Sequence, residues 1–178
     1  MLPYVKKAQA DGYEVIVTNT NDNYRNGKRI SGSGSPEEHI STVWKTIVQP
    51  ADAKSIVVVA HSYGGHLAVD LSANFKDDFN SKVFAVALTD SVHTRHRVSN
   101  RVNKIGMNFV SSDKPVGEPE HTSESDMPRV SSGHHKHEMT SHACIEKLFE
   151  FLRMRYKEER GEGDEGSPDA KKSKCDEL

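Results

Sequence analysis

The strongest constraint on the fold is the segment Ile56-Val-Val-Val-Ala-His-Ser-Tyr-Gly-Gly-His-Leu67. It opens with apolar, mostly β-branched residues, which are typical of a strand buried on both faces. Small residues follow at once, and leucines at helical spacing then predict a helix from Gly64 to Phe75. The junction resembles G-x-S-x-G with Ala60 in place of the first glycine, so it predicts a nucleophile elbow with Ser62 at its tip. A plain strand–turn–helix junction, in which small residues serve only packing, is the alternative.

The rest of the chain alternates strand and helix patterns. β-branched, apolar runs predict further strands at residues 13–18, 82–88 and 105–110, and a short one at 128–131. Helical spacing predicts helices at residues 2–11, 36–48 and from 145 onward; Ser35 would cap the second, with Glu38 completing a capping box. Alternating helices and doubly apolar strands predict an α/β fold with a mostly parallel sheet flanked by helices.

Composition divides the 178 residues into two parts. The chain is 34% apolar and 28% charged, and charged residues dominate its end. Residues 157–178 contain no aromatic side chain, so they cannot bury enough apolar surface to fold. We therefore predict one domain at residues 1–156 and a charged, disordered tail at residues 157–178.

Charge and cysteine content exclude several classes of protein. The formal net charge of −2 argues against a general polyanion binder, and the basic stretch at residues 93–104 fits a solvated loop better than an RNA site. The sequence contains no run of 18 apolar residues, so it predicts no transmembrane helix. Its first residues also lack the apolar core of a signal peptide. Cys144 and Cys175 do not make a disulfide framework. These features predict an intracellular protein.

A nucleophilic serine needs an acid and a base, in the order serine, acid, histidine for this architecture. Asp90 follows the strand at residues 82–88 and is the preferred acid, with Asp113 as its competitor. The backbone N–H of Tyr63 would lie at a helix N-terminus, where it could stabilise an oxyanion.

Histidines crowd before the last helix: His134, His135, His137 and His142. His137 is the preferred base because it leads directly into that helix. His137 and His142 are five apart, off the common face that a zinc-binding helix requires, and Cys144 has no partner cysteine at ligand spacing. We therefore expect no metal and no cofactor.

Several longer strings resemble the Argonaute-binding-protein-two (Arb-two) domain of the α/β-hydrolase superfamily. They are Asp11-Gly-Tyr-Glu-Val-Ile-Val-Thr-Asn-Thr-Asn21, Ser35-Pro-Glu-Glu-His39, Val58-Val-Ala-His-Ser-Tyr-Gly-Gly-His66 and Leu88-Thr-Asp-Ser-Val-His93. The resemblance covers about residues 1–155 and is closest to an animal family of co-transcriptional regulators. It implies an α/β-hydrolase-like fold with Ser62 at the family's serine position. The strings Val130-Ser-Ser-Gly133 and His137-Glu-Met-Thr-Ser141 resemble the family's closing motif, which favours His137.

The resemblance also implies a function. It suggests nuclear work through Argonaute and chromatin proteins, in small-RNA-linked heterochromatin formation and alternative splicing, with no direct DNA contact and no membrane. The protein would be found in the nucleus and also in the cytoplasm. The chain ends in Asp176-Glu-Leu178, which resembles an endoplasmic-reticulum retrieval signal, but we expect it to be silent without a signal peptide.

The sequence departs from the family pattern at its beginning. Only a short helix precedes the predicted strand at residues 13–18, where an α/β-hydrolase core has further strands and a loop that supplies the second oxyanion donor. We therefore expect an N-terminally truncated form, such as a shortened paralogue. The alternative function is a serine esterase that uses Ser62, Asp90 and His137, with little turnover because one oxyanion donor is lost.

Overall fold

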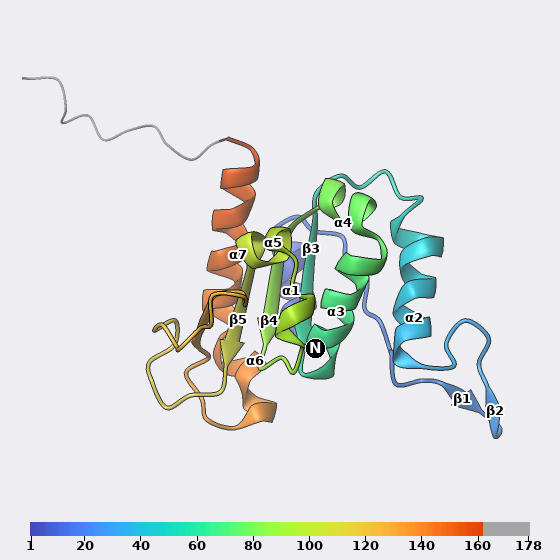
Figure 1. Ribbon diagram of the computed structural model, residues 1–178, viewed down its shortest axis with the longest axis horizontal. Helices are drawn as coiled ribbons and strands as arrows, with labels where there is room; N and C mark the ends of the chain where they lie inside the picture. Colours follow the sequence, from blue (N-terminus) through green and yellow to red (C-terminus); the bar gives the residue numbers. More distant parts are fainter. Residues whose placement is uncertain (162–178) are drawn as a thin grey trace, which may run out of the picture.

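A parallel sheet of four strands, in the order β3-β4-β5-β6, lies at the centre of the computed structural model, which describes residues 1–161 (Figure 1). The strands are β3 (Ile56–His61), β4 (Val83–Thr89), β5 (Gly106–Val110) and β6 (Arg129–Ser131). Their register aligns Ala60 with Leu88, and Thr89 with Phe109. Every residue of β4 is buried, whereas β3 lies at an edge and is only partly buried. The predicted α/β class with a parallel sheet is confirmed.

Helices cover both faces of the sheet and create two cores. One face carries α2 (Pro36–Val43), the π-helix η1 (Trp44–Val48), α3 (Tyr63–Asn74), α4 (Lys76–Lys82) and α5 (Asn100–Ile105). The other carries α1 (Leu2–Ala10) and α7 (Ile145–Glu159). Alternation along β4 sends Val86 and Leu88 into the first core and Ala85 and Ala87 into the second. Figure 1 shows α2 and α3 on one side of the sheet and α7 on the other.

Short elements complete the described chain. They are the hairpin strands β1 (Tyr24–Arg25) and β2 (Lys28–Arg29), the 3-10 turns η2 (Arg95–Arg97) and η3 (His137–Met139), and α6 (Thr140–Ala143). The predicted capping at Ser35 is present in part: its hydroxyl accepts from the Glu38 N–H at 3.2 Å. The Glu38 carboxylate accepts from the N–H groups of Gly32 and Gly34, so it does not return to Ser35 as in a capping box.

The predicted strand at residues 13–18 is wrong. Residues 13–19 are in no sheet, and Val15, Ile16 and Val17 are 38%, 56% and 52% exposed. A β-branched run favours extended backbone, but a strand also needs a neighbour that completes its hydrogen-bond ladder. Here the segment links α1 to β1 without pairing to β3 (Figure 1).

The end of the chain and the cysteines are placed as follows. The last helix continues through Glu159, so the first residues of the predicted tail belong to α7. Residues 162–178, with Cys175, lie outside the described part.

Cys144 is fully buried, and burial raises the pKa of its thiol to about 12, so the reactive thiolate is disfavoured. Among residues 1–161, no helix has both the length and the apolar character needed to span a membrane.

Candidate functional site

Ser62 sits in a strained turn between β3 and α3. Its φ of 53° and ψ of −121° are unusual for a residue with a side chain. Three backbone hydrogen bonds hold the turn: Ser62 N–H donates to the Thr89 carbonyl at 3.0 Å, and the Ser62 carbonyl accepts from Gly65 at 3.0 Å and Val92 at 3.3 Å. A serine presented in this way between a strand and a helix has the backbone geometry of a nucleophile elbow.

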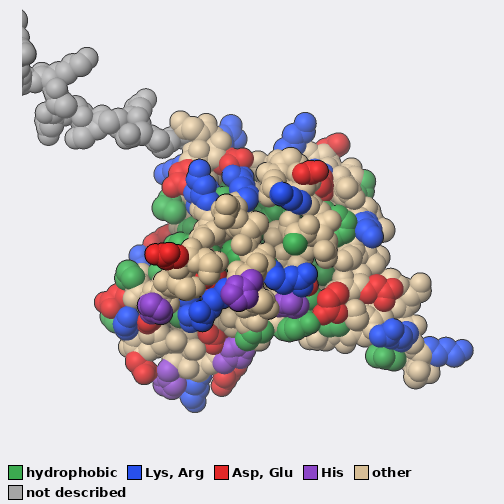
Figure 2. All heavy atoms as spheres, in the orientation of Figure 1, with side chains coloured by type: hydrophobic (Ala, Val, Ile, Leu, Met, Phe, Trp, Pro, Cys, Tyr) green, Lys and Arg blue, Asp and Glu red, His purple; other side chains and the backbone are tan. Residues whose placement is uncertain are grey.

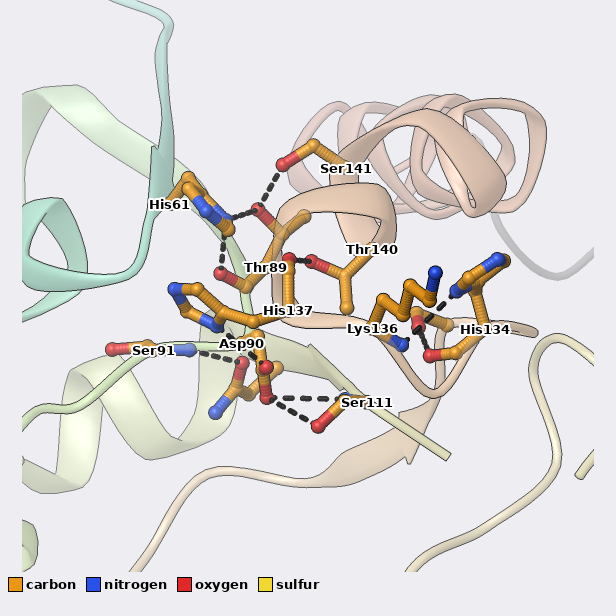
Figure 3. A network of polar contacts seen from close by, with 12 residues as sticks. His61, Thr89, Asp90, Ser91, Ser111, His134, Lys136, His137, Thr140 and Ser141 are labelled. Carbon is orange, nitrogen blue, oxygen red and sulfur yellow. Dashed lines mark hydrogen bonds and ion pairs between the residues drawn. The ribbon is translucent and has the colours of Figure 1, made fainter. Parts of the chain in front are cut away.

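The structure brings Asp90 and His137 together at the carboxyl end of the sheet. His137 Nδ1 lies 2.7 Å from Asp90 Oδ2, and Asp90 Oδ1 accepts from the N–H and hydroxyl of Ser111 at 3.0 and 3.2 Å (Figure 3). Asp90 comes from the end of β4 and His137 begins η3. Figure 2 shows histidines gathered on the lower part of this face, where the strands end.

Hydrogen bonding sets the ionisation of Asp90. Burial alone would raise the pKa of its carboxyl, but hydrogen bonds from the Ser111 backbone, the His137 ring and the Ser111 hydroxyl outweigh burial and bring that pKa below its usual range. The carboxylate is therefore ionised near neutral pH and accepts the Nδ1–H of His137. This leaves His137 Nε2 as the nitrogen with a free lone pair, as a general base requires.

His61 is a neighbour of this pair that the sequence reasoning missed. Its ring lies 4.6 Å from the His137 ring, centroid to centroid, at a tilt of 34°. His61 Nδ1 donates to the Thr89 carbonyl at 2.9 Å, and the Thr89 hydroxyl bonds the Ser141 hydroxyl at 2.7 Å (Figure 3). The one available signal was its position directly before Ser62. The ring of His61 limits the orientations open to His137.

The other candidates lie elsewhere. Asp113 pairs with His135 at 3.2 Å, and both side chains are more than half exposed. His134 stacks on His135 at 5.0 Å, and His142 lies in α6. The structure thus joins the preferred acid to the preferred base, and places two of the competitors, Asp113 and His135, in a separate surface pair.

Ser62 and Tyr63 are placed less completely. Within residues 1–161, no hydrogen bond joins the Ser62 hydroxyl to His137. Tyr63 is the first residue of α3, so its N–H lies at the helix N-terminus. Its side chain turns to α2, where its hydroxyl donates to Glu37 Oε1 at 2.5 Å. No group of three or more His, Cys, Asp or Glu side chains in the described residues could hold a metal ion.

Comparison with known proteins identifies the family. The profile of the Arb2 domain matches residues 1–116. The cotranscriptional regulator ARB2A of Homo sapiens is 32% identical over an alignment 209 positions long, and its homologue in Xenopus tropicalis is 32% identical over one of 210 positions. Each alignment covers 85% of this chain and 50% of the relative. The Dictyostelium discoideum homologue is 35% identical over 131 residues, 69% of this chain and 34% of the relative. This chain spans about half the length of the curated animal relatives, and no solved structure matches it significantly. The chain belongs to the Arb2 domain family.

Proposed function

We propose that this chain is a nuclear regulator that acts through protein interactions, with Argonaute and chromatin proteins as partners. It would act in small-RNA-linked heterochromatin formation and in the regulation of alternative splicing. Family membership and the cotranscriptional regulators among its relatives support the proposal.

An exposed apolar surface supports the interaction class. The side chains of Val15, Ile16 and Val17 are all more than a third exposed, and they follow one another in a segment outside any sheet. Separately, β3 is an edge strand of the four-stranded sheet, and its Val59 is 41% exposed. Consecutive exposed apolar residues and an unpaired strand edge are features of surfaces that other proteins cover.

A pulldown from nuclear extract tests the proposal, with the full chain of 178 residues as bait. We expect the wild-type chain to recover Argonaute or chromatin proteins. Ile16→Asp puts a charge into the exposed apolar segment and should weaken binding. We expect recovery to fall about tenfold, which corresponds to a loss of about 1.4 kcal/mol in binding free energy. Met154→Asp is the matched control, since Met154 is 47% exposed on α7, and its recovery should equal that of wild type. Recovery of neither partner by a folded wild-type bait would contradict the proposal.

A serine hydrolase acting on an ester or thioester is the second candidate, on an α/β-hydrolase-like fold. It is favoured by the 2.7 Å contact between Asp90 and His137 and by the positive φ of Ser62. In this mechanism the Ser62 hydroxyl oxygen attacks the carbonyl carbon while its proton passes to His137 Nε2. Asp90 keeps the imidazole in the required tautomer, and the Tyr63 N–H donates to the oxyanion. The proton then goes to the leaving group, and water releases the acyl group from Ser62.

The geometry favours the interaction role over turnover. The Ser62 hydroxyl lacks its hydrogen bond to the base in the described structure, and Tyr63 is the single oxyanion donor that we can assign.

A further inference from the structure

A second serine–histidine–aspartate cluster lies beside the candidate site. The Ser91 hydroxyl is 2.7 Å from His93 Nδ1, and His93 Nε2 is 2.8 Å from Asp126 Oδ1. The side chains of His93 and Asp126 are 3% and 6% exposed, so this relay is buried, in contrast to the exposed ring of His137. We call Ser91, His93 and Asp126 the buried relay.

The buried relay has no nitrogen left for proton transfer to a substrate. With an ionised carboxylate at Asp126, His93 Nε2–H donates to Asp126 and Nδ1 accepts from the Ser91 hydroxyl. The Met127 N–H also donates to Asp126 Oδ1 at 2.9 Å, and Arg95 Nε lies 4.0 Å from Oδ2. Every polar atom of the histidine ring is used inside the protein. The relay is therefore built to hold segments together.

The segments that it holds carry the candidate site. Ser91 packs against the first turn of α3, where a Cβ on Gly65 would lie 1.9 Å from the Ser91 hydroxyl oxygen. Val92 donates to the Ser62 carbonyl, and Asp90 directly precedes Ser91. Asp126 lies in the loop between β5 and β6, whose first residue, Ser111, also bonds Asp90 at the end of β4. Through His93, Asp126 joins that loop a second time to residues 90–93, which contact the Ser62 carbonyl and Gly65.

The strained backbone at Asp90 and Ser62 explains why stabilising contacts are needed here. Asp90 has a φ of 45° and Ser62 a φ of 53°, so two residues with side chains adopt left-handed or related backbone conformations on adjoining turns. Such conformations persist only when the surrounding contacts enforce them. The buried relay supplies such contacts to the 90–93 loop.

We propose that Ser91, His93 and Asp126 are positioning residues that hold the 90–93 loop against the Ser62 turn and so place Asp90 to bind His137. The inference goes beyond the proposed interaction role, and it stands whether or not Ser62 reacts with a substrate. It assigns opposite tautomers to two histidines of one chain, Nε2–H for His93 and Nδ1–H for His137.

Nitrogen-15 NMR of the histidine rings in the full chain reads these tautomers directly. In wild type we expect the Nε2–H form at His93 and the Nδ1–H form at His137. In the double variant His93→Phe/Asp126→Leu, the Nδ1–H form of His137 should fall several-fold, because Asp90 is no longer held in place. The double variant is preferred because removing both partners leaves no unpaired buried charge. Carbon-13 titration of the Asp90 carboxyl should show its lowered pKa rising toward the usual value.

Two further variants keep the test decisive. Ser91→Ala keeps the Cβ that packs on Gly65 and removes one link of the relay, so it should shift His137 in the same direction by a smaller amount; it decides the question if the double variant fails to fold. His135→Phe is the matched control, because it breaks the exposed pair with Asp113 and should leave His137 unchanged.

The contrary result is equally clear. Folded relay variants that keep the wild-type tautomer at His137 and the wild-type pKa at Asp90 would overturn the proposal. Failure of Ser62 to react with an acylating probe would count against the hydrolase candidate alone, because the NMR signals do not depend on turnover.

Discussion

Replacement of Gly65 by alanine should strongly destabilise the chain, although alanine normally stabilises a helix relative to glycine. A Cβ at position 65 would lie 1.9 Å from the Ser91 hydroxyl oxygen and 2.5 Å from its Cβ. Neither side can move easily, because the Ser62 turn is hydrogen-bonded to Thr89 and Val92. Overpacking of this kind costs about 1–3 kcal/mol or more, which exceeds the ~1 kcal/mol that alanine gains by helix propensity.

Urea unfolding followed by the fluorescence of Trp44, the single tryptophan, measures the effect. Gly64→Ala is the matched control: the same helix turn is changed, but the nearest atom to the new Cβ is the Ala60 Cβ at an ordinary 3.5 Å. Gly65→Ala combined with Ser91→Gly should recover part of the loss, because the colliding side chain is gone. Equal stability of the two alanine variants, or no rescue in the double variant, would contradict the close packing of α3 on the 90–93 loop.

Phe79→Ala should produce the other large loss, about 3–5 kcal/mol in the free energy of unfolding. Phe79 is fully buried and stacks on Trp44 at 5.6 Å between ring centroids. The Trp44 Nε1–H also donates to Asp78 at 2.8 Å, and Lys82 Nζ donates to the Val48 carbonyl at 3.3 Å, so an aromatic contact and hydrogen bonds join η1 and α4. Truncation of Phe79 leaves a cavity in the core between η1 and α4.

Phe75→Ala serves as the comparison for Phe79→Ala. Its ring contacts the same Trp44, at 6.1 Å, but the residue is only half-buried at the end of α3. We expect it to cost clearly less than Phe79→Ala in the same urea experiment. A loss from Phe79→Ala below about 1 kcal/mol, within the range of ordinary surface substitutions, would show that the core between η1 and α4 is not packed as described.

Local patterns predicted most of the sheet and its helices. The strands β3 and β4 are mostly apolar runs, and β3 leads straight into the helical spacing of α3, so short windows of sequence contain their signal; β5 is a weaker run that Asn108 interrupts. The order of Ser62, Asp90 and His137 along the chain also predicted that Asp90 and His137 would meet, because the ends of parallel strands share one edge of a sheet.

Non-local contacts explain what the sequence did not reveal. Residues 13–18 have strand propensity, but pairing depends on a neighbouring strand, which propensity does not supply. The contact of His61 with Thr89 joins residues 28 apart, and that of His93 with Asp126 joins residues 33 apart. No spacing rule marks such pairs. His93 was accordingly assigned to a solvated basic stretch, whereas its side chain is 3% exposed.

Labelling with a fluorophosphonate probe tests most directly the proposal that this chain acts by binding and not by turnover. The probe reacts with a serine only when a base activates its hydroxyl. The comparison uses wild type, Ser62→Ala and His137→Ala, each verified as folded. Because the Ser62 hydroxyl lacks a hydrogen bond to His137 in the described structure, we predict little or no labelling of any of the three. Stoichiometric labelling of wild type that both substitutions abolish would contradict the claim and make the chain a serine hydrolase.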